Sequence, residues 1–150
     1  MTLQEAANLL ESLKTETTKK YEIKVYEKFL HIITEMKIRQ LSPDEIQALE
    51  TELDSLDLKS NTENRKKHFK KALSKFETYL KDTLSLTSKG HYTNLYSGLG
   101  LSFGLLFGVA ILSNLERSLG ISLGLIGGML VGTIIGRSKD NKAKTEGRIY

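Results

Sequence analysis

Glycine recurs at every fourth position in two apolar runs, and this spacing limits the fold more than any other feature of the chain. Three of these glycines stand in the first run: Gly100, Gly104 and Gly108. Five stand in the second run: Gly120, Gly124, Gly128, Gly132 and Gly136. Because a helical turn takes about 3.6 residues, each set removes the side chains from one face of a helix. Two helix backbones then approach closely, which is how helices pack in lipid.

The two runs carry almost no charge, and this indicates that they enter a membrane. Between residues 90 and 136 the only charged side chains belong to Glu116 and Arg117. The runs predict membrane helices at about 96–113 and 119–136, which are close to the minimum length for crossing a hydrocarbon core. The polar segment Asn114–Ser118 would form the turn of a hairpin.

A strand is the alternative for the first run, where Leu99, Leu101 and Phe103 alternate with small residues. In the second run only the period of four persists, since Ile126 and Leu130 stand where a strand would need small residues. An isolated two-stranded hairpin would also leave backbone groups unpaired in lipid, whereas a helix pairs its own. We therefore expect helices. The predicted hairpin resembles glycine-zipper membrane hairpins in general, a packing pattern that implies no common activity.

The two glycine sets have matching registers in an antiparallel hairpin that turns near Glu116. In this arrangement Gly104 lies level with Gly128, and the two backbones touch along their length. The second set is longer than the first predicted helix can cover. We therefore expect Gly120 and Gly136 to contact another copy of the chain, so that the protein forms a homo-oligomer.

Positive charge flanks the hairpin on both sides and predicts its orientation. The tail after Gly136 carries five basic and two acidic residues. Since basic residues stay on the cytoplasmic side, both termini should be cytoplasmic, in an inner or cytoplasmic membrane, with the turn outside. The same basic residues are candidates for contact with lipid headgroups. They are Lys89, Arg137, Lys139, Lys142, Lys144 and Arg148.

The first 89 residues predict a soluble bundle of about four helices. Capping boxes begin two of them, with Thr2 paired to Glu5 and Ser42 paired to Glu45. Ser60, Asn61 and Thr62 form a break before a long fourth helix, for which Gly90 is the expected stop. The expected core contains Phe29, Ile33, Leu73 and Phe76.

The whole chain is thus expected to be all-α, in four parts. Residues 1–89 form the bundle, 90–95 a hinge, 96–136 the transmembrane hairpin and 137–150 a basic cytoplasmic tail. There is no cysteine, which excludes disulfides and thiolate metal sites.

Charge is segregated within the bundle. The third helix region carries acids without an intervening base, and the fourth begins with bases without an intervening acid. The acids are Asp44, Glu45, Glu50, Glu52, Asp54 and Asp57, and the bases are Arg65, Lys66, Lys67, Lys70, Lys71 and Lys75. The first interpretation is that the two helices neutralise each other; the second is that the basic helix contacts an acidic surface such as anionic lipid. Nucleic-acid binding is disfavoured because no stacking aromatics interleave with these bases.

No catalytic motif points to an enzyme, and no cofactor or metal site is expected. The three histidines are scattered, and there is no HExxH, phosphate-binding loop or nucleophile elbow. We expect a non-enzymatic, oligomeric, membrane-anchored interaction or signalling module whose bundle binds a protein partner. A small pore-forming or membrane-permeabilising effector is one alternative. An immunity or inhibitor subunit for a membrane partner is another.

Overall fold

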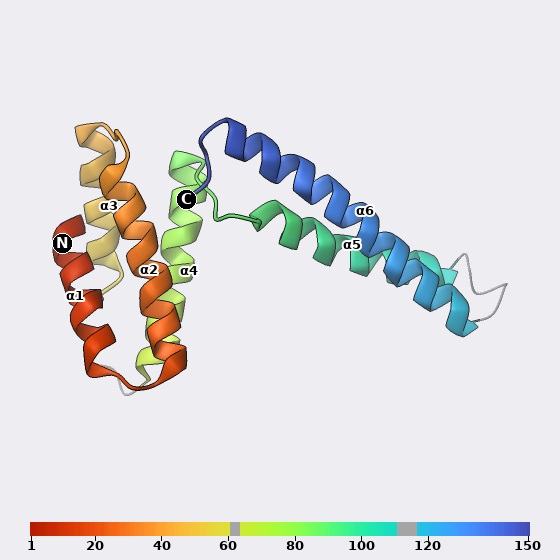
Figure 1. Ribbon diagram of the computed structural model, residues 1–150, viewed down its shortest axis with the longest axis horizontal. Helices are drawn as coiled ribbons and strands as arrows, with labels where there is room; N and C mark the ends of the chain where they lie inside the picture. Colours follow the sequence, from red (N-terminus) through yellow and green to blue (C-terminus); the bar gives the residue numbers. More distant parts are fainter. Residues whose placement is uncertain (61–63, 111–116) are drawn as a thin grey trace. The chain divides into compact units, whose positions relative to one another are not determined.

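The computed structural model describes residues 1–60, 64–110 and 117–150 and divides them into two units. The first unit contains Met1–Ser85 together with Tyr150, and the second contains Leu86–Ile149. Six helices and no strand occur in these ranges, so the expected all-α class is confirmed for the described part of the chain (Figure 1).

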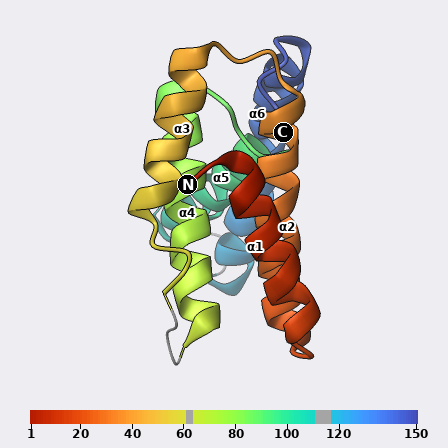
Figure 2. The ribbon, with the colours of Figure 1, turned by 90° about the vertical axis from the view of Figure 1, so that its left-hand side faces the viewer.

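Four helices form the first unit, in the order α1 (Leu3–Glu16), α2 (Lys20–Ile38), α3 (Pro43–Ser55) and α4 (Arg65–Leu84). Helix α1 packs against α2 and α3, and both α2 and α3 pack against α4 (Figure 2). The four helices therefore surround one core, as expected for a bundle. The predicted break before α4 lies partly outside the described residues, since these exclude 61–63.

Both predicted capping boxes are confirmed. At the start of α1, the Thr2 hydroxyl accepts from the Glu5 backbone N–H at 3.1 Å, and the Glu5 carboxylate accepts from the Thr2 N–H at 3.1 Å. Ser42 and Glu45 form the same reciprocal pair before α3. Hydrogen bonds from the Ser42 backbone and side chain hold the pKa of Glu45 below its usual value. These caps satisfy N–H groups that a helix start leaves without partners.

The predicted core residues Phe29, Ile33, Leu73 and Phe76 are all buried. Phe29 packs against Phe76 with ring centroids 5.5 Å apart, which joins α2 to α4. A second aromatic contact joins the same helices, with Tyr26 and Phe69 edge to face at 4.9 Å. Burial raises the pKa of Tyr26, and the nearby Glu22 carboxylate adds to this effect.

The second unit is a helical hairpin of α5 (His91–Ala110) and α6 (Arg117–Thr145). Both helices are long and apolar enough to cross a membrane. The turn expected at Asn114–Ser118 lies mostly outside the described residues, which resume at Arg117, the first residue of α6.

Three boundaries differ from those expected. Helix α4 ends at Leu84, before Gly90, because Ser85 adopts a left-handed conformation (φ 55°) and its N–H caps the Leu80 carbonyl. Helix α5 then begins at His91, so most of the expected hinge at 90–95 is helical. Helix α6 continues nine residues past Gly136 to Thr145, so most of the expected tail is helical as well.

The neutralisation expected between the acidic and basic helices is absent from the ion pairs of the described residues. Helix α4 does pack against α3, but its Arg65 pairs with Glu16 of α1. On α3, Asp54 pairs with the amino terminus at Met1. No ion pair in these ranges joins an acid of α3 to a base of α4.

We predict that Phe76→Ala destabilises the bundle by about 3–5 kcal/mol, because it leaves a cavity where the ring packs against Phe29. Ile38→Ala is the control, since Ile38 is 70% exposed and its truncation should change stability by less than about 0.5 kcal/mol. Urea unfolding of the full chain in detergent, followed by circular dichroism, measures both. Equal effects of the two variants would contradict the assigned core.

Candidate functional site: the apolar hairpin

Helices α5 and α6 pack with their glycines facing each other. A Cβ atom added at any of seven glycines would lie under 3.0 Å from the backbone of the opposite helix. They are Gly100, Gly104, Gly108, Gly124, Gly128, Gly132 and Gly136. The eighth, Gly120, supplies the carbonyl oxygen that a Cβ at Gly108 would meet at 2.6 Å. The helices therefore touch backbone to backbone, with no side chain of these positions between them.

The glycines of the two helices interdigitate rather than lie level. A Cβ at Gly104 would strike the Gly124 carbonyl and lie 3.1 Å from the Gly128 Cα. Gly104 thus sits between two successive glycines of α6, half a repeat from the expected level pairing with Gly128. Offsetting the two sets lets the backbone of each helix enter the gap that the other's missing side chains leave.

Gly120 and Gly136 contact α5 within the hairpin, whereas the sequence led us to expect that they contact another copy of the chain. Gly120 faces Gly108, and a Cβ at Gly136 would lie 2.5 Å from the Thr93 Cα. For Gly136 the reason is that α5 starts at His91, five residues earlier than expected, and so reaches the far end of the glycine set in α6.

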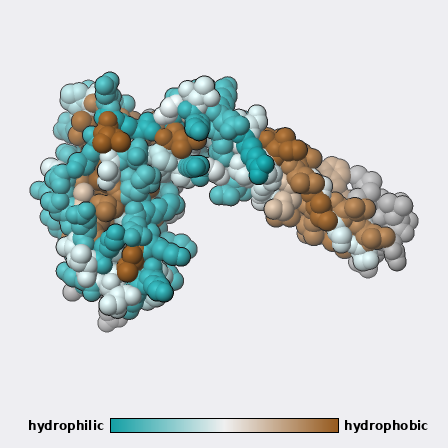
Figure 3. Space-filling view, viewed as in Figure 1, coloured by the Kyte–Doolittle hydropathy of each residue, from teal (hydrophilic) through white to brown (hydrophobic). Residues whose placement is uncertain are grey.

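The outer surface of the hairpin is apolar. Leu106, Ile126 and Ile134 are each 60% or more exposed, and both phenylalanines of α5 are 59% exposed. Figure 3 shows this surface in brown over α5 and α6. The bundle has the opposite distribution of side chains. In the hairpin small residues face inward and large apolar residues face outward, whereas the bundle buries its large apolar residues.

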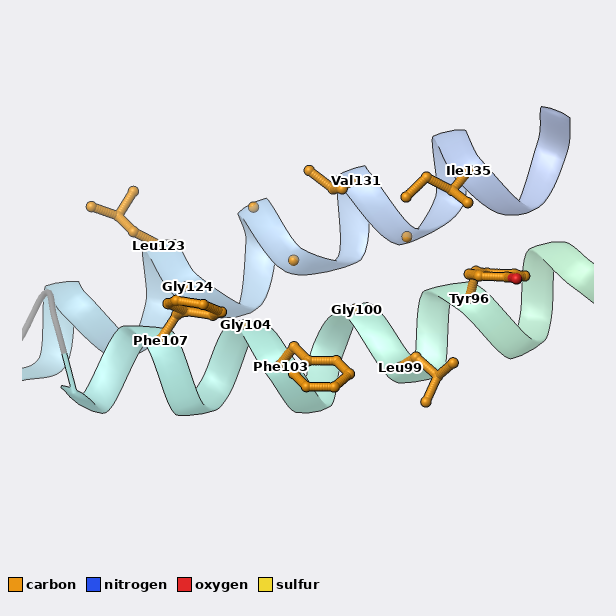
Figure 4. A pocket seen from close by; sticks show the side chains of 13 residues that line it. Tyr96, Leu99, Gly100, Phe103, Gly104, Phe107, Leu123, Gly124, Val131 and Ile135 are labelled. Atoms are coloured by element: carbon orange, nitrogen blue, oxygen red, sulfur yellow. The ribbon is translucent and has the colours of Figure 1, made fainter.

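A groove of about 550 Å³ runs along one side of the hairpin (Figure 4). Phe103 and Phe107 line it from α5, and Leu123 and Val131 line it from α6, with glycines between them. Gly127 also borders the groove, and a Cβ added there would meet nothing within 4 Å. This glycine is therefore not required for contact between α5 and α6.

Four hydroxyl groups along the apolar lengths of α5 and α6 form hydrogen bonds within the hairpin. Ser102 and Ser122 each donate to the carbonyl four residues earlier, at 3.1 and 2.9 Å. Thr133 donates to the Met129 carbonyl at 2.8 Å, so the Ser97 hydroxyl, 2.6 Å from that of Thr133, donates to it. This last bond crosses from α5 to α6 and adds a polar contact beside the glycines.

The open end of the hairpin is closed by Asp140 of α6, which sequence reasoning missed. Its carboxylate accepts from the backbone N–H groups of Tyr92 and Thr93 at 3.0 and 2.9 Å, and from the Thr93 hydroxyl at 2.6 Å. An acid of one helix thus caps the N-terminus of the other and meets the positive end of its dipole. The sequence spacing could have indicated this role, since Asp140 follows Gly136 by four residues and so continues the glycine face of α6.

A second tie lies beyond Asp140, where the segments before α5 and after α6 meet. The Thr87 N–H donates to the Arg148 carbonyl at 2.9 Å, and Thr87 forms an isolated parallel bridge with Ile149. Gly147 ends α6 with a left-handed conformation (φ 67°), which turns the chain toward this pairing.

The basic residues expected at headgroups lie mostly exposed around this end. Arg137, Lys144 and Lys89 are exposed, while Lys139 places its ammonium 5.7 Å from the centre of the Tyr96 ring. The other two contact an acid of the tail: Arg148 pairs with Glu146, and Lys142 lies 4.0 Å from it. Two expected headgroup residues are therefore partly neutralised within the tail.

We predict that Gly128→Ala weakens the packing of α5 on α6 by about 1–3 kcal/mol, because its methyl group would overlap the Gly100 carbonyl. Gly127→Ala is a matched control one residue away. Its methyl group meets open space, so it should be neutral or stabilising by up to about 1 kcal/mol through helix propensity. Energy transfer between dyes at Asn94→Cys and Ser138→Cys, during titration with sodium dodecyl sulfate, reports helix separation. Equal midpoints for the two variants would refute the assigned contact.

We also predict that Asp140→Ala loosens the start of α5 by about 1–2 kcal/mol, as loss of a capping side chain does. Amide exchange at Tyr92 and Thr93 should become faster, whereas exchange near Gly104 should not change. Asn141→Ala serves as the control, because the exposed Asn141 side chain has no part in the cap. Unchanged exchange at Tyr92 in Asp140→Ala would contradict this role.

The hairpin is therefore a candidate site for helix packing and for contact with lipid. Among residues 1–60, 64–110 and 117–150, no group of three or more His, Cys, Asp or Glu side chains is placed to hold a metal ion. No protein-family model, curated protein or solved structure matches the chain. The function must accordingly be argued from the geometry of the two units.

Proposed function

We propose that the chain is a non-enzymatic integral membrane protein, in which a glycine-zipper hairpin anchors a helical bundle that serves as an oligomeric interaction or signalling module. The observation that carries the proposal is the inverted pattern of the hairpin. Its glycines are enclosed between α5 and α6, while large apolar side chains cover the outside. In water such a surface would promote aggregation, whereas in lipid it matches the solvent.

The polar features of the hairpin support this assignment. Along the apolar lengths of α5 and α6, the hydroxyl groups of four Ser and Thr side chains are bonded within the hairpin. Charged side chains begin at Arg137, where an interface would lie, and Tyr92 and Tyr96 stand at the same end of the hairpin. Aromatic and basic residues gather at membrane interfaces, with the basic ones on the cytoplasmic side. Both termini would then be cytoplasmic.

A conducting pore is less well supported. A water-filled lining needs many polar groups, and the described hydroxyls are few; Ser102, Ser122 and Thr133 donate their protons to carbonyls of their own helices and so could only accept hydrogen bonds from water. The groove beside the glycines is bordered by apolar side chains and so offers no path for ions. Ser113, another candidate for a pore lining, lies outside the described residues. An anchored module uses the same hairpin without any such lining.

Cysteine labelling in intact cells tests both insertion and orientation. Ser118 and Ser138 are exposed residues that flank the apolar stretch of α6. We expect Ser118→Cys to react with an impermeant maleimide added outside, and Ser138→Cys to react only after the cells are permeabilised. The parent chain has no cysteine, so it provides an unlabelled control. Labelling of Ser138→Cys alone would reverse the orientation, and extraction of the protein by alkaline carbonate would refute membrane insertion.

A further inference from the structure

Two grooves on the α3–α4 side of the bundle place Glu52 of α3, here called the acidic wall, opposite Lys71 and Lys75 of α4, here called the basic wall. Glu52 lines one groove together with Lys75, Thr78 and Asp82, and the adjoining groove is lined by Ser55, His68, Lys71 and Lys75. Asp82 stands seven residues beyond Lys75 on α4, so the α4 side of the grooves is basic at Lys71 and Lys75 and acidic at Asp82. Lys71 and Lys75 therefore lie at about the level of Glu52 and Ser55, on the opposite wall. The two grooves have volumes of about 440 and 140 Å³.

The charges on these walls are not paired with each other inside one chain. Lys71 and Lys75 are exposed, and neither belongs to an ion pair among the described residues. Glu52 is half-buried and likewise belongs to no ion pair among the described residues. Other charges of the two helices are already engaged elsewhere, since Glu50 accepts from the Leu3 N–H at 3.2 Å and Lys66 lies 4.6 Å from the centre of the Tyr21 ring. Glu52, Lys71 and Lys75 are thus available to a partner on the α3–α4 side.

We propose that this side of the bundle binds the same side of a second copy of the chain. A twofold axis parallel to α3 and α4 would place α3 of each copy against α4 of the other, at the same level. The acidic wall of each copy would then meet the basic wall of its partner on both sides of the axis. The proposal rests on the proposed function, because a shared membrane holds the copies at high local concentration.

Self-association fits the charge pattern better than any partner with one sign of charge. An anionic membrane or a nucleic acid would be attracted by Lys71 and Lys75 but repelled by Glu52 and Asp82, which line the same groove. A second copy presents both signs in the required order. The facing glycines cannot serve instead, because α5 and α6 already enclose them within one hairpin.

Charge reversal on each wall tests the proposal in the full chain. The first variant, Lys71→Glu/Lys75→Glu, makes both walls acidic, and the second, Glu52→Lys/Ser55→Lys, makes the acidic wall basic. Lys20→Glu/Lys24→Glu makes the same charge change as the first variant on α2, which packs against α1 and α4. Each protein is labelled with a donor or acceptor dye and placed in zwitterionic liposomes at low density, where energy transfer reports association.

We expect association of the parent chain to weaken at least tenfold between 0.05 and 0.5 M salt (roughly the range over which the Debye length falls from 14 to 4 Å). Each wall variant alone should associate at least tenfold more weakly, the α2 control should match the parent, and an equimolar mixture of the two wall variants should recover association. This recovery is specific to copies that meet wall to wall.

Three results would overturn the proposal. The first is that either wall variant alone associates as strongly as the parent chain. The second is that the mixture of the two wall variants does not recover association. The third is that the bundles make contacts only when anionic lipid is added. Circular dichroism of every variant verifies that the bundle is folded. Carbonate extraction of the same samples separates the two hypotheses, because an inserted protein that stays monomeric refutes only this inference, whereas a protein that is extracted refutes the membrane anchor.

Discussion

The contact between the backbones of α5 and α6 is the constraint on which the second unit depends. Because the facing positions lack a Cβ atom, each helix occupies space that side chains would otherwise fill, and the large apolar residues are left on the outside. Close approach also brings Ser97 within reach of Thr133, and Asp140 within reach of the first N–H groups of α5. These polar contacts would be lost if the helices stood a side chain's width apart.

The two units place their large apolar side chains on opposite sides of their helices, inside in the bundle and outside in the hairpin. In the bundle, Phe29 and Phe76 fill the space between helices, and charged residues cover the outside. In the hairpin, the space between the helices is removed rather than filled. Burial of large side chains is favourable only where water is the alternative, so each arrangement suits a different solvent.

Much of this architecture could be predicted from local patterns, because caps and helix faces depend on residues a few positions apart. The Ser42 cap, the core position of Phe76 and the glycine spacing are all of this kind. The half-repeat offset of the glycines was not predictable, since it depends on how two backbones fit in space. The end of α4 at Ser85 depends on a left-handed residue that is not glycine. Asp140 was overlooked because its neighbours made the segment read as a basic tail.

The interlocked register fixes the apolar length that the hairpin offers to a bilayer. Neither helix can slide along the other without driving a backbone carbonyl into a Cα atom, so the two apolar stretches keep one relative position. From Leu119 to Gly136, the apolar stretch of α6 rises about 26 Å at 1.5 Å per residue, against a hydrocarbon core of about 30 Å. The difference of about 4 Å is small enough for slight local thinning of a bilayer to absorb it, and it favours residence in membranes of less than average thickness.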